Sequence, residues 1–210
     1  MISVHMIARM FETRQFDRLL GALAGNGLAL PLPVRAVLLQ SPVGVIALAR
    51  RRLAELTYGP TEAARAMLGE LLEAQAADGA FERCPVATAA AAAALRQLAD
   101  QPAGYDPEVG LAHERAIAAL AGMQRDDGLF ATGDDRTVDD RETTSAFVLY
   151  LLAGDEPFRQ AVRMHDLMNW FDERAAERRL GDDASGLWRM ARADSAPRRE
   201  TSTAVAAIAA

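Results

Sequence analysis

Gln75-Ala-Ala-Asp78-Gly79-Ala-Phe81 occurs a second time along the chain, as Gln124-Arg-Asp-Asp127-Gly128-Leu-Phe130. Both copies read Q-x-x-D-G-x-F, and both close an amphipathic helical pattern and precede an apolar run rich in Ala and Thr. Glycine at such a position suits the left-handed conformation that ends helices. A helix end that recurs in this way predicts a repeat architecture.

Two weaker copies extend the pattern toward both ends of the chain. Asn26-Gly27-Leu28 has Asn for Asp and lacks the Gln, and Ser185-Gly186-Leu187-Trp188 has Ser for Asp and Trp at the aromatic position. The residues before the four glycines stand at 26, 78, 127 and 185, at roughly even intervals. We therefore expect one domain over 1–210 with about four units, each a helix, a turn and a second helix rich in small residues, over approximately 1–56, 57–105, 106–154 and 155–210.

The apolar spacing is helical along nearly all of the chain, and the alternation typical of strands is missing. Asp106-Pro107 and Asp155-Glu156-Pro157 place a capping Asp just before a Pro, which is typical of helix starts. The fold class expected is therefore all-α. The predicted helices cover 4–24, 33–56, 61–76, 86–99, 107–124, 142–153, 157–178 and 198–210.

Composition and charge exclude several classes of protein. The chain has 210 residues, half of them apolar and a quarter charged, as in ordinary soluble domains. Its net charge of −6 argues against nucleic-acid binding, which needs a basic face. No apolar run is long enough to span a bilayer, and the N-terminus lacks the features of a signal peptide. These observations predict a soluble, cytoplasmic protein.

The quoted residues resemble the repeats of squalene-hopene and other terpenoid cyclases, and they are similar to those of protein prenyltransferase β-subunits. The second copy followed by Thr144-Ser-Ala-Phe-Val-Leu-Tyr-Leu151 is also similar to the thioester domains of complement and alpha-macroglobulin proteins. All these families fold as an α/α toroid, in which outer helices surround a ring of inner ones. The resemblance implies an incomplete toroid here, because about four helix pairs are fewer than a complete ring contains.

We interpret the repeated motif as a structural brace rather than as catalytic machinery. Its Gly ends a helix, its Asp can cap a turn, its Gln can bond free backbone groups, and its aromatic ring shields them from water. The residues assigned to this brace are Gln75, Asp78, Gly79, Phe81, Gln124, Asp127, Gly128, Phe130, Gly186 and Trp188.

The catalytic signatures of the resembled families are incomplete in this chain. Cyclases that protonate a double bond use D-x-D-D, and the nearest match, Thr137-Val138-Asp139-Asp140, has Thr in place of the first Asp. Aligning the helix that follows would instead put Arg141 to Thr144 at the motif. Prenyltransferases bind zinc through Asp, Cys and His, but Glu82-Arg83-Cys84 stands where D-x-C is expected, so we expect no metal site and no cofactor.

One acidic segment keeps a chemical alternative open. Asp134, Asp135, Asp139 and Asp140 are spaced so that they could hold Mg²⁺ and, through it, a diphosphate, and Asp139 and Asp140 are the candidate catalytic acids. The competing interpretation is a solvated loop within a polar linker over 125–141. We expect one of two functions. The first is a binding domain for an apolar, isoprenoid-like ligand or for a protein partner, which includes another copy of the chain. The second is an enzyme of isoprenoid metabolism that uses the acidic segment.

Overall fold

The computed structural model describes residues 40, 41, 43, 44, 47, 62–99, 107–132, 138–177 and 179–195. Within this part of the chain every regular element is an α-helix and no strand occurs, so the prediction of an all-α fold is confirmed there. The helices are α5 (Glu62–Ala74), α6 (Pro85–Ala99), α7 (Pro107–Met123), α8 (Val138–Leu152), α9 (Glu156–Ala161), α10 (Met164–Ala176) and α11 (Asp182–Ser195).

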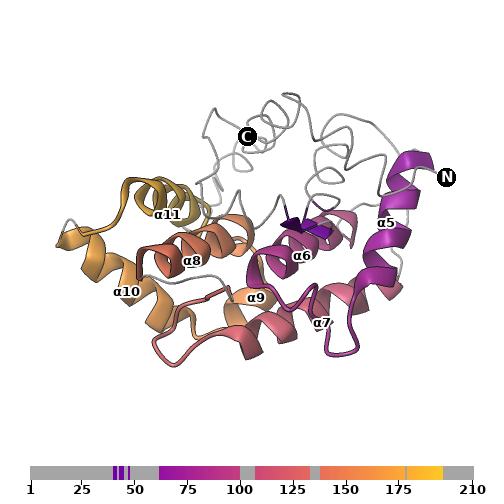
Figure 1. Cartoon of the computed structure of the whole chain (residues 1–210), viewed down its shortest axis with the longest axis horizontal. Helices are drawn as coiled ribbons and strands as arrows, with labels where there is room; N and C mark the ends of the chain where they lie inside the picture. Colours follow the sequence, from indigo (N-terminus) through magenta and orange to yellow (C-terminus); the bar gives the residue numbers. More distant parts are fainter. Residues whose placement is uncertain are drawn as a thin grey trace, which may run out of the picture.

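These helices lie in two layers. Figure 1 shows α6, α8 and α11 side by side in one row, with α7, α9 and α10 in a second row along them. Helix α6 packs against α7 and α8, α8 packs against α11, and α7 packs against α9. Along the chain, the described helices after α5 therefore alternate between the two layers, with α9 and α10 together forming one segment of the second.

Burial distinguishes the two rows, and we call the row that contains α6 and α8 the inner one. Residues 86–95 of α6 are each at most 8 % exposed, and residues 142–149 of α8 are also buried throughout. A helix that is buried on every side must have neighbours all around it, and small side chains let those neighbours approach closely. Helix α7 instead buries one face, with Ile117 and Leu120, and exposes Glu114 and Arg115 on the other. None of the described helices is long and apolar enough to cross a membrane.

The predicted helices at 61–76, 86–99 and 107–124 agree closely with α5, α6 and α7. The prediction of one helix over 157–178 is wrong, because α9 and α10 are separated at Val162 and Arg163. Val162 is extended, and both backbone groups of Arg163 are bonded by a side chain from another unit, described below. The predictions at 4–24, at Asn26-Gly27 and at 198–210, with most of 33–56, lie outside the described residues.

The predicted fourth copy of the turn is also wrong. Gly186 lies inside α11, a helix that the sequence did not predict, rather than at a helix end. This copy has Ser185 where the clear copies have the Asp that bonds the turn, and a helix tolerates one interior Gly at a cost of about 1 kcal/mol. Trp188 is buried, as expected of the aromatic position, but it stacks on Phe171 of α10 with ring centroids 5.1 Å apart.

The acidic linker ends earlier than predicted. Helix α8 begins at Val138, so Asp139 and Asp140 belong to a helix and not to a loop. Acidic residues are favourable in the first turn of a helix because the helix dipole is positive there. The polar composition that suggested a loop is equally typical of such a first turn.

Candidate functional site

The first Q-x-x-D-G-x-F copy forms a closed turn between α5 and α6. The Gln75 side-chain amide donates to the carbonyl of Gly79 at 3.1 Å and to the carbonyl of Ala112 in α7 at 2.8 Å. Asp78 accepts a hydrogen bond from the backbone N–H of Ala80 at 3.0 Å. Gln75 therefore closes its own turn and also ties it to the next helix pair.

The second copy makes the same bonds between α7 and α8. The Gln124 amide donates to the carbonyl of Gly128 at 2.7 Å, and Asp127 accepts from the N–H of Leu129 at 3.1 Å. Gln124 also donates to the carbonyl of Arg163 at 3.3 Å and accepts from its N–H at 2.7 Å. Arg163 precedes α10, so this turn too is tied to the following helix pair, at the break after α9.

A buried hydroxyl completes each turn. Thr88 accepts from the N–H of Phe81 at 3.1 Å and donates to its carbonyl at 3.3 Å. Ser145 likewise accepts from the N–H of Phe130 at 2.8 Å and donates to its carbonyl at 3.2 Å. The two phenylalanine rings are fully buried. The hydroxyls could not be predicted from the sequence, because 7 residues separate each pair's members in one copy and 15 in the other.

Removing either hydroxyl should destabilise the protein to a similar extent. We expect Thr88→Val and Ser145→Ala each to lower the free energy of unfolding by about 1–3 kcal/mol, because each leaves a buried N–H without its acceptor. Urea unfolding of the two variants measures the loss. Ser185→Ala, in the predicted fourth copy, is the control and should change stability by no more than about 0.5 kcal/mol. A loss in only one of the two brace variants would mean that the turns are not energetically equivalent.

Of the four acidic candidates, the structure describes the side chain of Asp140 alone. Asp134 and Asp135 lie outside the described residues, Asp139 lies in α8 with a side chain that is also outside them, and Asp140 is half-buried. Near the start of the same helix, Arg141 donates to the second oxygen of the brace residue Asp127 at 2.6 Å. The described residues contain no group of three His, Cys, Asp or Glu side chains placed to hold a metal ion.

A buried ion pair that the sequence reasoning missed links α8 to α10. The Glu142 side chain is fully buried, and its Oε1 accepts from Arg174 Nε at 2.8 Å and from Arg174 Nη2 at 2.5 Å. The guanidinium also lies over the ring of Trp170, 5.4 Å from its centroid. The other oxygen, Oε2, is buried and has no hydrogen-bond partner among the described residues, which costs about 1–3 kcal/mol if it stays unpaired.

A second buried pair links α7 to α9. His113 Nε2 lies 2.7 Å from Asp155 Oδ2, and both side chains are buried. The other oxygen of Asp155 accepts from the N–H of Phe158 at 3.4 Å and so caps α9. The prediction that Asp155 caps a helix start is confirmed. Its histidine partner has no signal in the sequence, because 42 residues separate the two.

Replacing Asp155 should destabilise the protein more than replacing His113, because Asp155 both bonds to His113 of α7 and caps α9. We expect Asp155→Ala to lower the free energy of unfolding by about 2–4 kcal/mol, since it removes a buried pair and a helix cap together. His113→Ala removes only the pair and should cost less. Thermal unfolding of both variants tests this order. Equal losses would show that the cap contributes nothing measurable.

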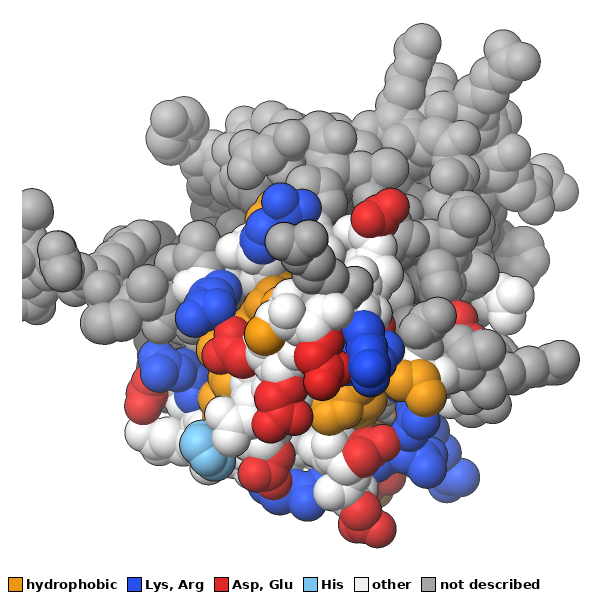
Figure 2. Space-filling view, turned by 90° about the vertical axis from the view of Figure 1, so that its left-hand side faces the viewer, with side chains coloured by type: hydrophobic (Ala, Val, Ile, Leu, Met, Phe, Trp, Pro, Cys, Tyr) orange, Lys and Arg blue, Asp and Glu red, His pale blue; other side chains and the backbone are white. Residues whose placement is uncertain are grey.

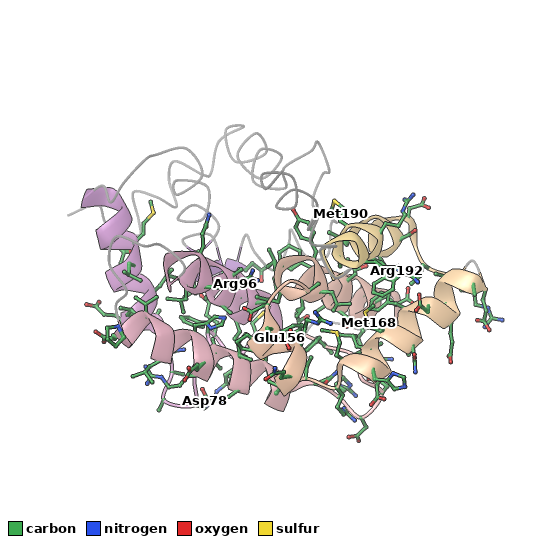
Figure 3. All side chains as sticks on the ribbon, turned by 180° about the vertical axis from the view of Figure 1, so that it is seen from behind. Asp78, Arg96, Glu156, Met168, Met190 and Arg192 are labelled. Carbon is green, nitrogen blue, oxygen red and sulfur yellow. The ribbon has the colours of Figure 1, made fainter. Side chains whose placement is uncertain are left out.

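The polar groups of both turns bond mainly to the backbone. In both copies the Gln amide and one Asp oxygen are bonded to backbone, and Asp78, labelled in Figure 3, lies in a turn at the edge of the molecule, away from the inner helices.

Comparisons of the chain with models of protein families, with curated proteins and with solved structures found no match.

Proposed function

We propose that this chain is a helical-repeat binding domain, built as an incomplete α/α toroid of about four helix pairs, whose concave face takes an apolar, isoprenoid-like ligand or a protein partner. The observation that carries this proposal is that the polar groups of the repeated motif bond to the backbone. Its glutamines, one oxygen of each aspartate and the following hydroxyls bond to backbone. The most distinctive residues of the chain therefore support assembly of the repeats.

The toroid-like arrangement is supported by the direction of these bonds. Each turn reaches from its own helix pair to a backbone group of the next, Ala112 in one case and Arg163 in the other. Repeating one displacement from pair to pair produces a curved array with an inner and an outer face. In an open array of this kind we place the ligand or partner on the part of the inner face that lies outside the buried stretches 86–95 of α6 and 142–149 of α8.

The surface over α10 and α11 favours a recognition site elsewhere. Figure 2, in which the described part of this face is seen, shows acidic and basic side chains interspersed with scattered apolar ones, without a large patch of one kind. Single exposed apolar residues are normal on any protein and need no partner. This face therefore offers no large apolar patch for the proposed ligand.

Native mass spectrometry of the freshly purified protein tests the binding proposal. We expect a discrete mass above that of the 210-residue chain, either from a retained apolar molecule or from a second polypeptide. Denaturing mass spectrometry of the same sample gives the mass of the bare chain as the control. A single bare monomer in both spectra, from cells of the native host, would contradict the proposal.

A second candidate function is an enzyme of isoprenoid metabolism, favoured by one observation. Asp139 and Asp140 lie on one helix, α8, and carboxylates are ligands that could hold Mg²⁺ and, through it, a diphosphate. For the binding domain we expect Asp139→Asn with Asp140→Asn to leave retained ligand or partner unchanged. A Mg²⁺-dependent turnover of farnesyl diphosphate by the wild-type protein that this double variant abolishes would instead establish the enzyme.

A further inference from the structure

The buried carboxylate of Glu142 is not required by the repeat itself. The hydroxyls of Thr88 and Ser145 mark equivalent positions of α6 and α8, because they make the same bonds to their turns. Three residues earlier, α8 has Glu142 and α6 has Pro85. The pair α5–α6 is thus built without an acid at this position, whereas the pair α7–α8 has a fully buried glutamate there.

The geometry of the ion pair leaves one acceptor free. Arginine usually binds a carboxylate with two parallel bonds, one to each oxygen. Here Nε and Nη2 of Arg174 both donate to Oε1 of Glu142. Oε2 is one of four buried side-chain oxygens without a partner among the described residues, the others being in Glu70, Gln75 and Gln97. Buried acceptors in folded proteins are nearly always bonded, to protein or to a bound molecule. Oε2 is therefore positioned to accept a hydrogen bond from outside the described chain.

Charge decides which donor fits. The carboxylate and the guanidinium neutralise each other, so a second cation at Oε2 would bury an uncompensated positive charge, and an anion would be repelled by the oxygen. We propose that Oε2 of Glu142 binds a neutral hydroxyl group, at a site formed where α8 meets Arg174 and Trp170 of α10. The hydroxyl belongs to a water molecule or to the alcohol group of a small ligand. This site does not depend on the proposed toroid or on its concave face.

A crystal structure of the full-length wild-type protein tests the site directly. We expect electron density about 2.5–3.0 Å from Oε2, the distance of an O–H···O hydrogen bond. An isolated peak identifies water, whereas continuous density with a matching extra mass in native mass spectrometry identifies a ligand alcohol. Either result supports the proposal. An ordered Oε2 that has no density beside it, or that bonds to a group of this chain or to a metal ion, overturns it.

A double variant supplies the second arm of the test. Glu142→Met with Arg174→Met removes both charges together, and the density and any extra mass should then be lost. The control is Asp172→Asn with Arg192→Gln, which removes the exposed pair between α10 and α11 and should leave the density in place. Persistence of the density in the methionine variant would also overturn the proposal, because the bound molecule would then be held by other groups.

Discussion

Replacing Gly79 by Ala should lower the free energy of unfolding by about 2–5 kcal/mol, whereas the same change at Gly128 should cost about 1–2 kcal/mol. Both glycines have positive φ, 87° and 82°, which an L side chain adopts only with strain. They differ in their surroundings. A Cβ on Gly79 would lie 2.3 Å from the backbone carbonyl oxygen of Arg115, whereas one on Gly128 would lie 3.1 Å from Cβ of Asp166.

The difference arises because a helix backbone cannot move aside locally. Arg115 is in the middle of α7, so relieving the clash at Gly79 requires the turn to separate from the next helix pair. Asp166 is exposed, and a shift of a few tenths of an ångström relieves the contact at Gly128. The larger loss at Gly79 would therefore measure how closely one unit packs on the next.

Urea unfolding of the two variants provides the measurement, with Gly122→Ala as the matched control. Gly122 is helical and a Cβ there meets nothing within 4 Å, so this variant should gain about 0.5–1 kcal/mol. The midpoint should change without a change in the slope, as for a pure effect on stability. Equal losses at Gly79 and Gly128 would contradict the close packing of the first turn on α7.

The turns were predictable because their signals are local. Gly79 and Gly128 adopt positive φ within turns that follow the ends of α5 and α7, and Asp78 and Asp127 bond residues only two positions away. The backbone groups that the glutamines reach had no such signal. A carbonyl is present at every residue, so no residue type marks Ala112 or Arg163 as the acceptor.

Gly186 shows the limit of this local reasoning. Its glycine and the aromatic residue that follows resemble the other copies, but the Asp that bonds the turn is absent, and α11 runs through the position. Contacts from another helix decide the outcome, since Trp188 stacks on Phe171. Such contacts depend on residues far apart in the sequence and leave no periodic pattern.

The candidate site was less predictable than the fold for a related reason. Asp139 and Asp140 attracted attention because acids in series have a known chemistry, but Glu142 alone has none. Its significance comes from its burial and from Arg174, which is 32 residues away. An isolated glutamate near the start of a helix is ordinarily solvated, so neither its burial nor its partner can be inferred from the sequence.

Replacing Arg174 by Met should be among the most destabilising single changes in the described part of the chain, with an expected loss of about 3–5 kcal/mol. The variant leaves Glu142 fully buried without its cation and also removes the contact of the guanidinium with Trp170. Replacing Glu142 by Met should cost less, because the Arg174 side chain is 24 % exposed and can turn its charge toward water. This asymmetry follows from which of the two charges is accessible to solvent.

The double variant Glu142→Met with Arg174→Met removes both charges and keeps apolar side chains in their place. It therefore separates the electrostatic contribution of the ion pair from the packing of the two side chains. Replacing a buried ion pair by apolar residues of similar volume is often neutral or stabilising, so the double variant should recover most of the loss caused by Arg174→Met. A double-mutant cycle measured by urea unfolding gives the coupling between the two residues. If the effects are instead additive, or Arg174→Met costs less than about 1 kcal/mol, water reaches the carboxylate and the pair is a surface interaction. A strong recovery would show that the pair can be removed without loss of the fold, which is what a site retained for binding requires.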